Sequence, residues 1–528
     1  MNRFDWLSEY LARLEDEHVL VHRGHRGLPP THTLLIDAED WGRAAEVAHG
    51  LGMRWCAAWG DPHPAHVGIF ACLEFQGDYL LLQTEVPWET PVLSSHTPHY
   101  PAANRPERHL QDLLGVAFTD HPDARRWTRH AAWPEGAFPL RPDFPPEGLD
   151  AAHPTPPDGD YPFEAIRGAG IHEIPVGPVH AGIIEPGHFR FQAVGEKILR
   201  MEERLGYVHK GIEKRAVGMS PERLVRLAAR VSGDTAVGHA WAACQALERA
   251  TGTPVPGRAL YLRALLAERE RVANHLGDIG AICNDVGFAF AQAQCSRLRE
   301  AWLRRNAELF GHRLLMDTLC PGGVQVDLDA RGARTLQTDH AVLREAFSSL
   351  YDLLEDQPSL EDRLVDTGIL TTESAVELGV VGYVARASGV DFDLRRDNPY
   401  LPYTEFPIPV AVAVEGDVAA RVRIRAQELL AALEIMDRLL EALPDTPLHN
   451  ALRAVPGEAA GFGAVESWRG ETLCYVRLDP DGRVARYFPR DASWLNWPAL
   501  ERIVMGNIVA DFPVCNKSVN GSYSGCDL

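Results

Sequence analysis

The chain has 528 residues, of which 45% are hydrophobic and 24% charged, so it has enough apolar material for more than one hydrophobic core. Its formal net charge of −21 at pH 7 argues against a primary role on nucleic acid or on anionic lipid head groups. No apolar run reaches the length that spans a bilayer, and the first residues lack the apolar segment of a secretory signal, so we expect a cytoplasmic protein.

Residues 1–141 have the pattern of a compact α+β domain. Apolar residues recur at helical spacing over residues 4–17, and residues 40–51 predict a second helix with an aspartate near its start. Strands are predicted at residues 31–37, 67–75 and 79–85. A stretch rich in proline, aspartate and glycine at residues 142–162 then predicts a linker with little reason to pack.

Residues 163–528 are dominated by long helical segments. Strand-like pieces flank a turn at residues 188–193 and 197–201, and two more follow at residues 410–415 and 471–478. Alanine and leucine at three- and four-residue spacing predict helices that bundle around a shared interior. These helices are expected at residues 221–251, 257–282, 286–315, 330–354 and 418–443. The fold class is therefore α+β: an N-terminal α+β domain followed by a mainly helical bundle with peripheral β-strands.

The nine cysteines are scattered, and no two have Cys-x-x-Cys spacing. This pattern excludes a disulfide framework and an iron–sulfur cluster held by a local motif. We interpret most of them as small buried apolar residues. A role in ligand binding stays open for Cys515 and Cys526, although a closed soft-metal site needs about four ligands.

Several motifs resemble known subunits of membrane-bound redox complexes. Residues 100–141, with Trp133-Pro134 and Pro139-Leu-Arg141, resemble the thirty-kilodalton peripheral subunit of respiratory complex I. The segments at residues 177–191 and 206–214 resemble the opening of the nickel–iron hydrogenase and complex I large (quinone-site) subunit family. Within this family, the sequences of these two segments are most similar to those of formate hydrogenlyase and other energy-converting hydrogenases. The resemblance implies a fused two-module chain.

The resemblance also shows what is missing. Hydrogenases of this family hold nickel and iron with two Cys-x-x-Cys pairs, and the matching positions here are Ser232, Thr235, Ser522 and Gly525. A hydroxyl is a poor ligand for a soft metal and glycine has no side chain, so we expect no nickel chemistry. We call the two segments that match the cysteine pairs, residues 232–235 and 522–525, the first and second relic motifs. Asp234 lies inside the first, where it adds a carboxylate to the lining of the expected cavity. A tyrosine that complex I uses near the quinone is matched by Gly233, and Tyr523 is the nearest aromatic in the second motif.

Three residues of the opening loop are candidates for proton handling. The resemblance implies that His180, Glu185 and His188 line the cavity where hydrogenases keep nickel and complex I admits the quinone head group. Glu185 matches a glutamate that hydrogenases use for proton passage, and a partly buried carboxylate has the raised pKa that this role requires. The alternative is that both histidines form hydrogen bonds to the loop backbone and that Glu185 pairs with an arginine such as Arg190.

Further charged residues lie on the predicted long helices. Asp285 matches a buried acid that pairs with a loop histidine in complex I, while its position after Asn284 also suits a helix N-cap. Glu268, Arg271 and His275 share one helical face, and we interpret them as a structural ion pair at a subunit interface.

Together these features predict a metal-free large subunit of an energy-converting complex, with Glu185, His180 and Asp285 moving protons as a nearby cluster is reduced. The implied partners are an iron–sulfur small subunit, a ferredoxin-like subunit and antiporter-like membrane subunits that hold the chain peripherally at the cell membrane. Quinone is the candidate acceptor. The chain has no dinucleotide-binding motif, so NAD would act only through other subunits. The alternatives are a nickel–iron hydrogenase and a non-catalytic structural bridge.

Overall fold

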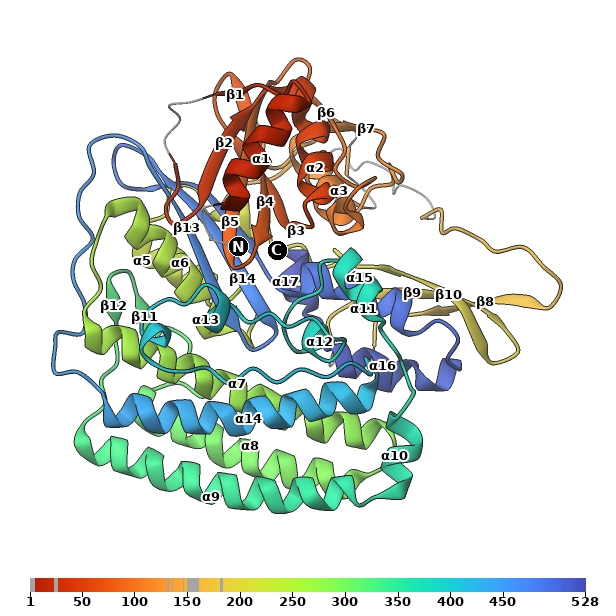
Figure 1. Ribbon diagram of the computed structural model, residues 1–528, viewed down its shortest axis with the longest axis vertical. Helices are drawn as coiled ribbons and strands as arrows, with labels where there is room; N and C mark the ends of the chain where they lie inside the picture. Colours follow the sequence, from red (N-terminus) through yellow and green to blue (C-terminus); the bar gives the residue numbers. More distant parts are fainter. Residues whose placement is uncertain are drawn as a thin grey trace.

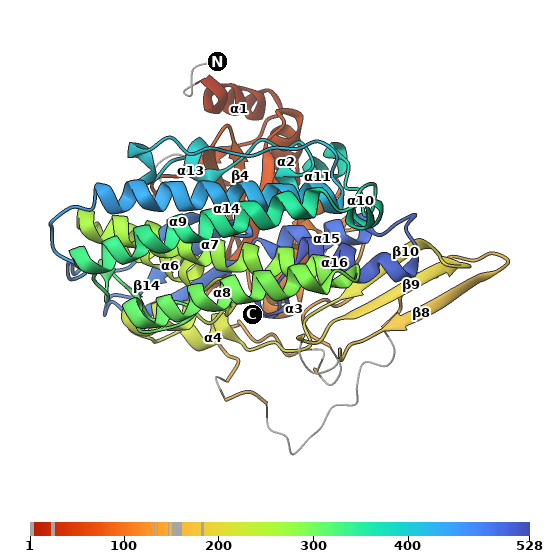
Figure 2. The ribbon, with the colours of Figure 1, turned by 90° about the horizontal axis from the view of Figure 1, so that it is seen from below.

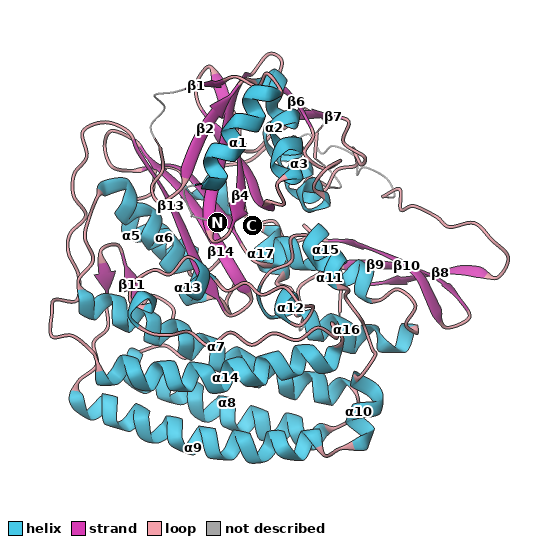
Figure 3. Cartoon of the chain, in the orientation of Figure 1, coloured by secondary structure: helices cyan, strands magenta, loops and turns pink. Residues whose placement is uncertain are grey.

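The computed structural model describes residues 5–22, 27–130, 133–134, 136–145, 147–149, 161–180 and 184–528. The N-terminal module lies at the top of the view in Figure 1, and the long helices of the second module form the lower part. Figure 3 shows that most strands lie in the upper half and at one side. The fold is the predicted combination of an α+β module and a helical bundle with peripheral strands.

The N-terminal module is a five-stranded sheet that carries helices on one face. The strand order is β1-β2-β5-β4-β3, with β2 and β5 parallel and the other neighbours antiparallel. Its elements are α1 (Asp5–Asp16), β1 (Val21–His22), β2 (His32–Ile36), α2 (Trp41–Gly50), β3 (Arg54–Pro62), β4 (His66–Phe75), β5 (Asp78–Pro87), β6 (Val92–Ser94), α3 (Asn104–Leu114) and β7 (Ala117–Thr119). The predicted helices and strands of this module are confirmed. Strand β3 was missed because it is apolar on both faces and so shows no alternation.

The second module is built on long helices that lie side by side in Figures 1 and 2. They are α7 (Gly257–Asp285), α8 (Ala289–Phe310), α9 (Ala330–Glu355) and α14 (Val418–Glu441). The shorter helices are α4 (Ile212–Ala216), α10 (Pro358–Leu364), α11 (Thr372–Glu377), α12 (Gly382–Arg386), α13 (Leu394–Asp397), α15 (Ser493–Ile503), α16 (Phe512–Val519) and α17 (Tyr523–Asp527). None of the described helices is long and apolar enough to span a membrane.

Two predictions for this module are wrong. The helix expected at residues 221–251 is two helices, α5 (Pro221–Ala228) and α6 (Ala236–Thr251), because the chain turns at the first relic motif, where the Thr235 amide donates to the Ser232 carbonyl. The strand expected at residues 410–415 is a loop. Its backbone bonds not a neighbouring strand but the end of α12, where the Ala413 amide donates to the Arg386 carbonyl at 2.9 Å.

The strands of the second module form two three-stranded sheets and a short pair. Strands β8 (Ile171–Val176), β9 (His188–Val194) and β10 (Lys197–Arg204) make the arm that projects to the right in Figure 1. Strands β13 (Ala459–Ser467), β14 (Gly470–Leu478) and β15 (Val484–Arg490) form the second sheet, and β11 (Leu319–Cys320) pairs with β12 (Gly323–Val324). Gly461 and Gly463 let β13 approach α6 closely, since a Cβ at either glycine would overlap backbone carbonyls of that helix.

The two modules share a buried junction. Trp59 of β3 stacks on Phe488 of β15, with ring centroids 5.3 Å apart. Beside this stack, Arg477 donates to both carboxylate oxygens of Asp61 at 2.8 Å. A junction that combines stacked aromatic rings with a buried bidentate ion pair fixes the modules against each other.

The predicted linker falls mostly on residues 150–160, which lie outside the described residues. At its end, the expectation of little packing is wrong. Arg108 donates to the Tyr161 hydroxyl at 2.7 Å, and the Arg204 guanidinium lies 3.9 Å from the centre of the Tyr161 ring. The two arginines thus anchor the chain where it enters the second module.

All nine cysteines are free thiols that are buried or half-buried, as predicted. Burial raises the pKa of Cys515 to about 12 and that of Cys526 well above its ordinary value. Both thiols are therefore protonated at neutral pH, a state that suits packing better than metal ligation.

Candidate functional site

The two relic motifs meet in the interior of the second module. Ser232 and Thr235 lie in the turn between α5 and α6, and Ser522 caps the start of α17 by accepting a hydrogen bond from the Gly525 amide at 2.9 Å. The Ser232 and Ser522 hydroxyl oxygens are 2.8 Å apart, which is a direct hydrogen bond. The structure therefore brings together the four positions that the sequence singled out.

Asp234 is held by an arginine that the sequence analysis did not identify. Arg469, in the turn between β13 and β14, donates to both Asp234 carboxylate oxygens at 2.6 Å. Ser232 also donates to Asp234, at 2.7 Å. Burial opposes ionisation of Asp234, but the charge and hydrogen bonds of Arg469 outweigh it and lower the pKa of the carboxyl. Asp234 is thus the anion of a bidentate ion pair, and its carboxylate is already bound by the Arg469 side chain.

A second acid fills the space beside Gly525. A Cβ built on Gly525 would lie 2.6 Å from the Asp491 carboxyl carbon, so a cysteine at this position requires Asp491 to move. His239 Nε2 lies 2.7 Å from Asp491 Oδ2, and the Ser493 amide donates to Oδ1 at 2.8 Å. Burial opposes ionisation of Asp491, but the bond and charge of His239 and the charge of Arg469 hold its pKa well below its usual range.

These contacts do not fit a nickel–iron centre. The hydroxyls of Ser232 and Ser522 bond each other, which leaves no room for an atom between them. The part of the chain that the structure describes contains no group of three or more histidine, cysteine, aspartate or glutamate residues arranged to hold a metal. Contrary to the expected cavity lining, the relic positions form a hydrogen-bonded polar cluster, which we call the relic cluster: Ser232, Asp234, Thr235, His239, Arg469, Asp491, Ser522 and Gly525.

The opening loop reaches the second relic motif through Glu185. Its carboxylate accepts a hydrogen bond from the Ser524 amide at 2.7 Å. The Lys210 ammonium donates to the Ser524 hydroxyl at 2.6 Å and to its carbonyl at 2.7 Å. Burial lowers the pKa of Lys210, and Glu185 opposes this effect. The predicted proximity of Glu185 to the relic motif is confirmed, but its predicted burial is wrong because it lies on the surface of the opening loop.

The two histidines of this loop adopt the alternative arrangement. His180 Nε2 lies 2.7 Å from the Gly187 carbonyl, and His188 Nδ1 lies 3.3 Å from the Gly177 carbonyl. Burial lowers the pKa of His188. Arg190 pairs with Glu173 at 2.9 Å and donates to His188, so the alternative pairing of Glu185 with Arg190 is wrong. Both histidines hold the loop in shape.

Asp285 is neither a buried acid nor a helix N-cap. It is the last residue of α7 and is exposed, because α7 continues further than expected and α8 begins only after Phe288. Its carboxylate therefore lies at a helix end, where partial burial raises its pKa and the charge of Lys517 opposes this effect.

The predicted ion pair on α7 is confirmed, but its placement at a subunit interface is wrong. Glu268, Arg271 and His275 are at most 1% exposed and belong to a buried charge network within the chain. Glu428 of α14 is its centre, since it accepts hydrogen bonds from Arg386 at 2.7 Å and lies 2.9 Å from His275 Nε2. The network also includes Asp393, Arg395 and Glu466. Burial and the charge of Asp393 raise the pKa of Glu466 to about 7, which reduces the excess of negative charge.

The residues that sequence reasoning missed come from distant parts of the chain. Arg469 and Asp491 are separated by more than 200 residues from their partners Asp234 and His239. The one available signal was Asp234 itself, because a carboxylate placed in an interior motif needs a partner.

Comparisons with known proteins agree with this architecture. Residues 34–149 match the family model described as "Respiratory-chain NADH dehydrogenase, 30 Kd subunit", and residues 285–459 match the one described as "Respiratory-chain NADH dehydrogenase, 49 Kd subunit". Hydrogenase-4 component G of Escherichia coli (strain K12) is 33% identical over 468 residues, which cover 88% of this chain and 81% of that protein. Formate hydrogenlyase subunit 5 of the same organism is 33% identical over 458 residues, which cover 85% and 79%.

A solved structure of a related complex has a similar fold. A chain of the membrane-bound sulfane sulfur reductase, an archaeal respiratory membrane complex, matches with a TM-score of 0.63 and 27% identity, covering 68% of this chain and 99% of that one. The fold and these comparisons thus identify an oxidoreductase-type subunit related to those of membrane-bound respiratory and hydrogenase complexes. The chain belongs to the family of hydrogenase-4 component G and formate hydrogenlyase subunit 5, with a complex I 30 Kd-type domain fused at its N-terminal side.

Proposed function

We propose that this chain is the metal-free large subunit of a membrane-associated, energy-converting redox complex. Electrons arrive from an iron–sulfur cluster of a partner subunit, and the relic cluster and opening loop supply protons and fixed charge where nickel would stand in a hydrogenase. Further partners are a ferredoxin-like subunit and antiporter-like membrane subunits. The observation that carries the proposal is the replacement of all four ligand positions by a hydrogen-bonded cluster around the Asp234–Arg469 pair.

The acceptor in this proposal is a quinone, whose reduction to a quinol takes two electrons from the cluster and two protons. Glu185 is the proton donor, because its exposed carboxylate touches both solvent and the second relic motif through Ser524. The Lys210 ammonium, which also donates to Ser524, places a positive charge next to the site of transfer. His180 and His188 position the loop, and Asp285 takes part only as a surface acid. Relatives that reduce other acceptors make the identity of the acceptor the first thing to test.

The Glu185→Gln variant tests this role in the assembled complex. Glutamine keeps the bond from the Ser524 amide but cannot exchange a proton, so we expect quinone-dependent turnover to fall at least about tenfold while the complex still assembles. Glu196→Gln, an exposed carboxylate in the turn between β9 and β10, is the matched control and should leave turnover unchanged.

A structural bridge between partner subunits is the second candidate, and the filled relic cluster favours it. That role predicts unchanged turnover in both variants. Full activity of Glu185→Gln would therefore refute the proton-donor assignment and support the bridge.

A further inference from the structure

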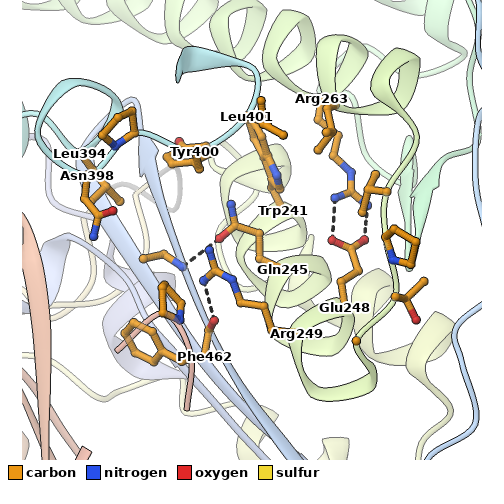
Figure 4. Close-up of a pocket in the computed structure, with 18 of the residues that line it drawn as sticks. Trp241, Gln245, Glu248, Arg249, Arg263, Leu394, Asn398, Tyr400, Leu401 and Phe462 are labelled. Atoms are coloured by element: carbon orange, nitrogen blue, oxygen red, sulfur yellow. Dashed lines mark hydrogen bonds and ion pairs between the residues drawn. The ribbon is translucent and has the colours of Figure 1, made fainter. Parts of the chain in front are cut away.

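A pocket of about 710 Å³ lies toward the C-terminal end of α6, the helix whose first turn borders Thr235 of the relic cluster (Figure 4). Its walls come from α6, the start of α7, residues 394–401 and β13, with Pro30 and Tyr79 of the N-terminal module closing one side. This volume is in the range of pockets that hold small organic molecules. None of the relic-cluster residues lines it.

Four aromatic side chains lie in the walls of the pocket: Tyr79, Trp241, Tyr400 and Phe462. Trp241 of α6 meets Tyr400 edge to face, with ring centroids 5.2 Å apart, and Phe462 of β13 meets Tyr79 in the same way at 5.7 Å. Figure 4 shows Trp241, Tyr400 and Phe462 around the same space. Aromatic walls of this kind favour a flat apolar body between them.

Of the two arginines that line this space without an ion pair to a described residue, Arg249 is the less exposed. Arg249 donates to the Phe462 carbonyl at 2.7 Å and forms no ion pair with a described residue. Its sequence neighbour Glu248 is already engaged, because Arg263 donates to both of its carboxylate oxygens at 2.6 and 3.0 Å. Burial lowers the pKa of Arg249 to about 10, so the guanidinium stays charged at neutral pH. A half-buried guanidinium that forms no ion pair can donate two hydrogen bonds to a carboxylate in a bidentate geometry.

Two other polar side chains of the pocket, Gln245 and Arg453, are donors that suit an anion, whereas the dipole of α6 limits how much negative charge the ligand can carry. The Gln245 side-chain oxygen accepts from the Ala464 amide at 3.1 Å, which leaves its amide nitrogen as a donor. Arg453 adds a second cation at the pocket wall and, within the described chain, also lacks an ion pair. The pocket lies at the C-terminal end of α6, whose dipole opposes a multiply charged group such as a phosphate.

We propose that this pocket binds a small planar organic monocarboxylate, with the carboxylate on the Arg249 guanidinium and the apolar body between Trp241, Tyr400 and Phe462. The site is separate from the relic cluster, so it stands or falls independently of the function proposed above.

Titration of the full chain with benzoate tests the proposal by calorimetry and by ligand-observed NMR. We expect saturable binding with a dissociation constant on the order of 1 mM, since benzoate is a small ligand. Benzamide has the same shape without the charge and should bind at least about tenfold more weakly. Inorganic phosphate should not compete with benzoate.

Variants of Arg249 test whether benzoate binds in this pocket. Arg249→Gln should weaken benzoate binding at least about tenfold, and Arg249→Lys, which keeps the charge but loses the bidentate fork, should have a smaller effect. Arg334→Gln changes an exposed arginine on α9 and is the matched control. The melting temperature of Arg249→Gln should be no lower than that of the parent, because it removes an unpaired charge. Absence of benzoate binding up to about 10 mM, or equal binding by Arg249→Gln and Arg334→Gln, would overturn the proposal.

Discussion

Replacing Glu428 with glutamine should lower the free energy of unfolding by about 3–5 kcal/mol, the cost of breaking a buried ion pair. Glu428 is 5% exposed, pairs with Arg386 and Arg271, and lies within hydrogen-bond distance of His275. Burial opposes its ionisation, but Arg386 and His275 outweigh this and hold its pKa well below its usual range. Glutamine keeps the shape and loses the charge, so the cations are left without their main partner. Urea denaturation of the purified chain measures the difference.

The same helix offers a matched control for this experiment. Glu434 lies further along α14, is exposed, and pairs with Arg438 one helical turn away. Glu434→Gln should cost less than about 0.5 kcal/mol, as is usual for an exposed pair. Equal stability of the two variants would mean that the buried charge network contributes nothing specific to this fold.

Replacing Asp234 with asparagine should cost about 2 kcal/mol, less than for a fully buried pair. The Arg469 side chain is only 3% exposed, but that of Asp234 is 34% exposed, so solvent reduces the loss. Because Arg469 lowers the pKa of Asp234, the stabilisation is present at pH 7 and is lost as the pH falls below about 4 through the folded-state pKa. Thermal unfolding of both proteins between pH 3 and 7 checks both points.

An exposed ion pair of the same geometry serves as a control, because it shows how much of the loss of stability comes from burial of the pair. Arg230 donates to both carboxylate oxygens of Asp317 at 2.6 and 2.7 Å, and the two side chains are 45% and 40% exposed. Asp317→Asn should therefore cost less than about 1 kcal/mol. If Asp234→Asn is no more destabilising than this control, the relic cluster is not held together by its central ion pair.

The sequence predicts the long helices well because their apolar faces repeat over many turns. The prediction fails where a helix break or a strand has no distinct residue pattern of its own. Alanine-rich spacing continues across the relic motif at residues 232–235, so the break between α5 and α6 is not visible. Strand β13 consists largely of small residues because it packs closely on α6, and small residues carry no strand signal.

The candidate site was predicted only in part, for a physical reason. Motif resemblance places Ser232, Thr235, Ser522 and Gly525 together, and their mutual contacts agree with it. The charges of Arg469 and Asp491 come from turns after β13 and β15, and nothing local in the sequence marks either residue as interior. Asp285 was misplaced because a shift of a few residues in a helix end moves a side chain from the interior to the surface.

Nickel content of the assembled complex tests the central claim most directly. Elemental analysis by mass spectrometry, after purification from cells grown with added nickel, should find iron from partner clusters but less than about 0.1 nickel per chain, because hydroxyls and a carboxylate–arginine pair are poor ligands for a soft metal. About one nickel per chain, retained after chelator treatment, would contradict the account and identify the relic cluster as a working metal centre.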